Sequence, residues 1–135
     1  MRAGSDEENQ FSCFLADSAL DVLLAGRLLI HTGWKLLQHP LYGNYRPHQQ
    51  PYRSLILEHN PAAIQADGGL SRIIPDDWSL HLIEEAINVY QSVAMIVPSD
   101  APPSLREDCA LLDLELMRLP LTQAGWPEEA LGPRA

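Results

Sequence analysis

Apolar residues recur every three or four positions in two parts of the chain, a spacing typical of helices with one buried face. The first part covers residues 17–32 and ends before Gly33, where a helix favours a left-handed C-terminal residue. The second covers residues 77–96 and stops before Pro98, because proline does not continue a helix. These two patterns predict two amphipathic helices.

Shorter apolar runs predict strands at residues 11–15, 34–38 and 52–57. Residues 111–117 fit two structures. Their leucines alternate with acids, as in an edge strand, but the apolar positions from Leu105 to Leu119 also fall at helical spacing. The pattern leaves a long helix and a short helix followed by an edge strand equally open.

The chain has 135 residues, which suits one domain, and 46% of them are hydrophobic, which is enough for a core. We predict a single small α/β domain over residues 11–120, with a short sheet flanked by two or three amphipathic helices. Residues 1–10 are expected to fray, residues 58–75 to be irregular, and residues 121–135 to form a flexible C-terminal tail, since prolines and glycines interrupt it.

Charge is distributed unevenly along the chain. The formal net charge is −9, yet no Asp or Glu occurs in residues 22–57, which carry four cations, Arg27, Lys35, Arg46 and Arg53. The residues outside this acid-free segment therefore carry −13. Such an acidic balance argues against nucleic acid as a partner, because Lys and Arg contacts to phosphate supply most of that affinity.

A long loop, residues 39–51, lies inside the acid-free segment between two predicted strands. Three prolines and the Gly43-Asn44 pair favour an ordered loop without regular structure. Loops of this length are often functional. We call residues 39–51 the basic loop.

Two interpretations of the basic loop stay open. In the first, side chains and backbone amides from the loop and its flanks bind a carboxylate or phosphate, with His39 as the only candidate acid or base. In the second, the cations are exposed and pair with acids elsewhere. The candidate ligand-binding residues are Lys35, His39, Gly43, Asn44, Arg46, Arg53 and Ser54.

Other chemistry is weakly represented. The glycines do not form a phosphate-binding loop, the histidines are too widely spaced for a typical metal site, and we predict no cofactor. Cys13 and Cys109 lie in apolar runs and are expected to be buried reduced thiols. The apolar runs are too short to span a bilayer and the N-terminus is acidic, so we expect a cytoplasmic protein without membrane contact.

The central motif resembles the GrdX family. Residues 31–47, HTGWKLLQHPLYGNYRP, and the following Pro51-Tyr52-Arg53-Ser54 carry the resemblance, with further similarity at residues 82–87 and 107–114. It spans residues 11–117. Family members differ at the N-terminus, where an extra strand and an Asn-Pro turn have no counterpart in residues 1–10.

The resemblance implies an accessory protein associated with the glycine, sarcosine or betaine reductase system of amino-acid fermentation, without an assigned reaction. Our leading hypothesis is a non-enzymatic accessory or small-anion-binding protein, with reductase components as possible partners. One alternative is a small enzyme acting on a carboxylate or a phosphorylated metabolite. The other is a structural module that binds a partner protein through Tyr42 and Tyr45.

Overall fold

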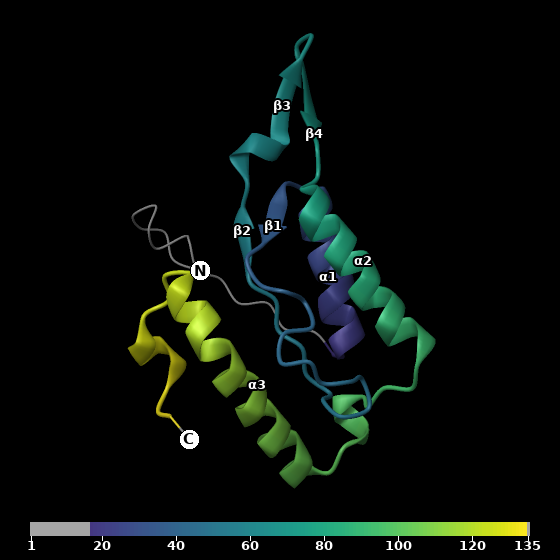
Figure 1. Ribbon diagram of the computed structural model, residues 1–135, viewed down its shortest axis with the longest axis vertical. Helices are drawn as coiled ribbons and strands as arrows, with labels where there is room; N and C mark the ends of the chain where they lie inside the picture. Colours follow the sequence, from purple (N-terminus) through teal and green to yellow (C-terminus); the bar gives the residue numbers. More distant parts are fainter. Residues whose placement is uncertain (1–16, 135) are drawn as a thin grey trace.

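The computed structural model describes residues 17–134, and the strand predicted over residues 11–15 lies outside the described residues. Within residues 17–134, three α-helices and two antiparallel pairs of strands form the fold (Figure 1). The helices are α1 (Ala19–His31), α2 (Asp77–Ser92) and α3 (Pro103–Gln123). The strands pair as β1 (Trp34–Leu36) with β2 (Leu57–His59), and as β3 (Ile64–Asp67) with β4 (Leu70–Ile73). The predicted small α/β domain is confirmed, with its strands divided between two short sheets.

The core lies between α1 and α2, whose predicted positions are confirmed to within a few residues. Leu23 and Ile30 from α1 meet Ile83 and Ala86 from α2, and none of these four side chains is exposed to solvent. The Ser18 hydroxyl caps α1 by accepting a hydrogen bond from the Asp21 amide. The apolar spacing thus places both helices because each buries one face against the other.

A buried hydroxyl joins β1 to the start of α2. Ser79 Oγ accepts a hydrogen bond from the Leu36 amide at 2.8 Å and donates one to Asp76 Oδ2 at 2.7 Å. Asp76 caps α2 by accepting from the Ser79 amide. These Ser79 bonds, with a smaller contribution from the charge of Lys35, hold the pKa of Asp76 below its ordinary value.

Two predictions of secondary structure need correction. The strand expected over residues 52–57 begins only at Leu57, because β1 is three residues long and its ladder ends where the Leu37 amide donates to the Ile56 carbonyl. Residues 58–75 are not irregular, since they contain β3 and β4. Gly68 and Gly69, which both have positive φ, form the turn of a tight hairpin between these two strands.

Residues 111–117 belong to one continuous helix. α3 runs for 21 residues and buries Cys109 and Met117. The helical alternative is therefore correct, and the alternation of leucine with acids is a coincidence of residue order. Figure 1 shows α3 apart from the α1–α2 pair, with the basic loop passing between them.

The C-terminal segment contacts α3. Arg118 is buried, and its Nη2 donates to the carbonyls of Leu131 and Pro133 at 3.2 and 2.6 Å. Leu131 itself is buried at the end of a 3-10 turn, Glu128–Leu131. The flexibility of residues 121–135 stays a prediction, although their first three residues continue α3 and Leu131 has a fixed place in the structure.

Candidate functional site

Arg53 anchors the basic loop from inside. Its side chain is only 6% exposed, and all three of its nitrogen atoms donate hydrogen bonds. Nη1 and Nη2 donate to the carbonyls of Tyr42 and Tyr45, each at 2.9 Å, and Nε donates to the Tyr90 hydroxyl on α2 at 3.1 Å. The guanidinium thus replaces a strand ladder, because it binds backbone carbonyls that the irregular loop leaves without partners.

The loop backbone turns tightly beside α3. The amide of Asn44 donates to the Leu41 carbonyl, and both Gly43 and Asn44 have positive φ, of 90° and 57°. A Cβ on Gly43 would lie 2.8 Å from Leu116 Cδ1, so this backbone packs directly on the helix. The Asn44 amide, which we expected to contribute to an anion site, is used inside the loop.

Two further contacts attach the loop region to α3. Ser54 Oγ donates to Asp113 Oδ2 at 2.5 Å, and the buried Gln50 donates its Nε2 to the Cys109 carbonyl at 3.1 Å. Burial raises the pKa of the Asp113 carboxyl, while the Ser54 bond and the charge of Arg53 oppose that rise. Burial also raises the pKa of the Cys109 thiol, as expected for an unreactive buried cysteine.

Gln50 and Asp113 were not among the site residues predicted from the sequence. The sequence carries no signal that separates Asp113 from Glu115, because both acids alternate with the same leucines. Gln50 gives no signal either, since glutamine in a loop is ordinarily exposed.

Lys35 lies far from Arg53. It occupies β1, directly across from Glu58 on β2, and its charge acts on Asp76 at the start of α2. Arg53 contacts Tyr90, which is about 21 Å further along α2 at 1.5 Å per residue. The structure therefore does not bring these two cations into one pocket.

His39 borders a shallow hollow against α2. Its Nδ1 accepts a hydrogen bond from the Leu41 amide at 3.0 Å, which leaves Nε2 as the free nitrogen of the ring. The hollow has a volume of about 420 Å³, and Glu85, Asn88 and Ser92 supply its polar lining. It offers donors and one carboxylate, so it is not a purely cationic site.

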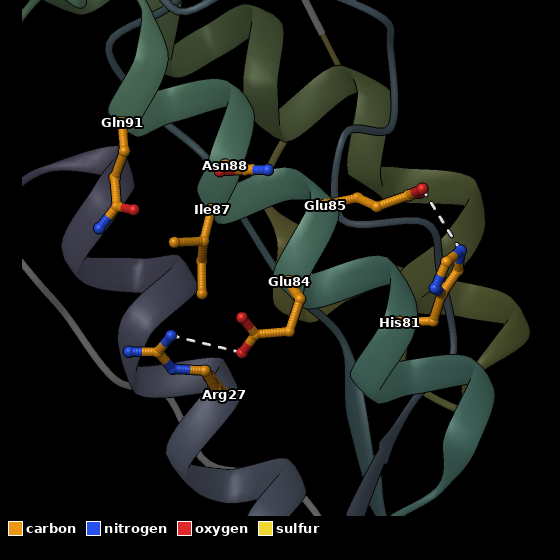
Figure 2. A pocket seen from close by; sticks show the side chains of 7 residues that line it. All are labelled: Arg27, His81, Glu84, Glu85, Ile87, Asn88 and Gln91. Carbon is orange, nitrogen blue, oxygen red and sulfur yellow. Dashed lines mark hydrogen bonds and ion pairs between the residues drawn. The ribbon is translucent and has the colours of Figure 1, made fainter.

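A second hollow, of about 260 Å³, lies between α1 and α2 (Figure 2). Arg27 reaches across it to Glu84 with an Nη1–Oε1 distance of 3.3 Å, and His81 meets Glu85 on the same helix at 3.3 Å. Arg27 therefore fits the second interpretation, in which a cation of the acid-free segment pairs with an acid from elsewhere in the chain.

Arg46 differs from the other two arginines of the acid-free segment, Arg27 and Arg53. It is exposed on the basic loop, next in sequence to Tyr45, which is 36% exposed, and we call the exposed surface of these two residues the outer side of the loop. Its backbone amide donates to Gln49 Oε1, but its guanidinium has no hydrogen bond or ion pair with any residue of the 17–134 range. Of the three arginines in the acid-free segment, Arg46 is therefore the one whose guanidinium is available to a ligand or partner, as judged within that range.

Two negative findings apply to the described part of the chain. In residues 17–134, no helix is both long and apolar enough to cross a membrane. The same residues contain no group of three or more His, Cys, Asp or Glu side chains arranged to hold a metal ion.

The architecture and the anchored loop define a small α/β domain that carries the central motif on a fixed loop. Residues 3–122 match the profile of the family described as GrdX-like protein, so the chain belongs to the GrdX-like family. The match includes residues 3–10, where we expected a departure from the family. No curated protein and no solved structure shows significant similarity to the chain.

Proposed function

We propose that this protein is a non-enzymatic accessory protein of the glycine reductase system, which binds an acidic surface of a reductase component through the outer side of the basic loop. Family membership supports the association with that system. The observation that supports this binding mode is that two arginines of the acid-free segment have different roles. Arg53 is buried and holds the loop, whereas Arg46 is exposed without an acid partner among the described residues.

The outer side of the loop suits protein recognition. Arginine and tyrosine are enriched at protein–protein contacts, and a loop fixed by Arg53 loses little conformational entropy on binding. An arginine also binds a carboxylate through two parallel hydrogen bonds. Arg46 and Tyr45 are the contact residues of this proposal, and His39 lies on the same loop.

A small carboxylate or phosphate is the second candidate partner, favoured by the same exposed guanidinium. A ligand that binds only the folded state adds about 2.7 kcal/mol to the free energy of unfolding at a hundredfold excess over its dissociation constant. Titration with phosphate, acetyl phosphate and glycine should then raise the melting temperature with at least one of them. The absence of a shift with all three would exclude this candidate and leave the protein partner.

The main experiment measures binding to purified glycine reductase components by biolayer interferometry. Arg46→Glu should weaken binding at least about tenfold, because a desolvated attraction of about 1.4 kcal/mol or more becomes a repulsion. Arg134→Glu makes the same charge change at an exposed arginine of the C-terminal segment, which pairs with Glu128, and should leave the affinity unchanged. Equal effects of both variants, or no binding by the wild type, would refute the proposal.

A further inference from the structure

The β3–β4 hairpin projects beyond the N-terminal end of α2, away from the core (Figure 1). Every residue of β4 is exposed, and Leu70 next to the turn is 74% exposed. Large apolar side chains are also exposed along the hairpin and at its base, where α2 begins. They are Ile64, Leu70, Ile73, Ile74 and Trp78.

The hairpin has an edge strand whose outward backbone groups can form hydrogen bonds with another strand. In the structure described, β3 and β4 pair only with each other, although an isolated two-stranded hairpin is marginally stable in water. The Ile74 amide donates to the Ala63 carbonyl, and bonded pairs alternate along an antiparallel ladder. The amides of Ser71 and Ile73 therefore point outward from the free edge of β4.

The distribution of charge allows the hairpin of a second copy of the chain to approach this edge. The chain carries −9, so two copies repel each other over most of their surfaces. Residues 63–75 contain one acid, Asp67, and one base, Arg72, and are neutral as a segment. A four-residue strand is about 13 Å long, which exceeds the screening length of about 8 Å at physiological salt. Hairpins that meet by their edges can thus keep the two acidic bodies apart.

We infer that the hairpin is a homodimerisation arm, and that its occupant is the β4 edge of a second copy of this chain. Antiparallel pairing of the same strand across a two-fold axis is self-complementary and joins two hairpins into a four-stranded sheet. An axis through Arg72 would set like charges opposite each other. An axis through Ser71 avoids this, because Leu70 then lies opposite Arg72 of the partner subunit and packs on its aliphatic stem.

Sedimentation equilibrium of the full chain tests the inference. The wild type should show a species of twice the chain mass, and Leu70→Arg should raise the dimer dissociation constant at least about tenfold, because it meets Arg72 of the partner subunit. Leu28→Arg makes the same substitution at a leucine of α1 that is also highly exposed, and should leave the constant unchanged.

Two proline variants identify the edge. Ser71→Pro removes an outward amide, which an edge strand tolerates, and should abolish the dimer while circular dichroism shows an intact fold. Ala66→Pro makes the same change on the outer edge of β3 and should leave the dimer in place. A monomeric wild type, a dimer that survives both Leu70→Arg and Ser71→Pro, or loss of the dimer only in Ala66→Pro or Leu28→Arg would overturn the inference.

Discussion

The basic loop and the β3–β4 hairpin both connect core elements, but different interactions hold their backbones in place. The loop has no regular structure, yet the buried side chains of Arg53 and Gln50 fix it to α2 and α3. The hairpin has a complete ladder, yet the exposed positions in it and at its base include its large apolar residues. Regular structure and tertiary attachment are therefore separate properties in this chain, and substitutions should affect the two regions differently.

The largest effect is expected from Arg53→Ala. It leaves the Tyr42 and Tyr45 carbonyls and the Tyr90 hydroxyl without their donor, and each buried group that loses its partner costs about 1–3 kcal/mol. The free energy of unfolding, measured by urea denaturation, should fall by about 3 kcal/mol or more. Arg46→Ala is the matched control, and an exposed arginine should change stability by about 0.5 kcal/mol or less. Similar losses in both variants would contradict the anchoring role of Arg53.

A glycine pair compares the two regions directly. Gly43→Ala in the loop combines a φ of 90° with a Cβ 2.8 Å from Leu116 Cδ1, whereas Gly69→Ala in the hairpin has a φ of 82° and no neighbour within 4 Å. Each variant should lose about 1 kcal/mol or more to backbone strain, and Gly43→Ala should lose more. Urea denaturation of both proteins measures the difference. Equal losses would show that Leu116 moves aside without cost.

The partly buried carboxylate of Asp113 makes part of the stability depend on pH. Its folded pKa lies above the ordinary value of 3.8, so between these two values the folded state binds more protons than the unfolded state. The free energy of unfolding should therefore fall as pH rises through that interval, by about 1.4 kcal/mol for each pH unit that the interval spans.

Asp113→Asn isolates this dependence, because an amide has no proton to lose and still accepts from Ser54. Its stability relative to the wild type should rise with pH across the interval and then stay constant, as followed by thermal denaturation. Asp108→Asn, an exposed acid on the same helix, should show no such rise. A stability difference for Asp113→Asn that decreases with rising pH would contradict the direction in which burial moves this pKa.

The smallest effect is expected in the hairpin. Leu70→Ser replaces a largely exposed side chain and should change the free energy of unfolding by about 0.5 kcal/mol or less when the protein is dilute enough to be monomeric. Thermal denaturation at several protein concentrations measures it, since dimer formation makes the melting temperature depend on concentration. A large loss in the monomer would show that Leu70 packs on the chain's own core.

Local patterns predicted what local physics determines. Periodic leucines located α1 and α2, because each helix buries one face, and Gly33 marked the end of α1. The hairpin was missed because we gave no weight to a double glycine as a turn. Local spacing alone left α3 open, since burial against distant residues selects the helix.

The candidate site was harder to predict because it depends on distant partners. Arg46 and Arg53 look equivalent in sequence, and only the fold reveals that Arg53 meets Tyr90, 37 positions further along. Lys35 shares the acid-free segment with them but acts near the opposite end of α2. Charge along the chain therefore identified the region but did not assign the residues their roles.

The bond from Gln50 to the Cys109 carbonyl makes the reactivity of the Cys109 thiol a measure of how often the loop opens. Cys109 is buried and its backbone carbonyl accepts the bond from Gln50, so we expect a thiol reagent to reach its sulfur only when the loop region and α3 separate. In a Cys13→Ser background, the labelling rate of Cys109 would report how often α3 and the loop part. Because the proposed contact surface is the other side of that loop, a bound partner that holds the loop in place would slow the chemistry of a sulfur atom it never touches.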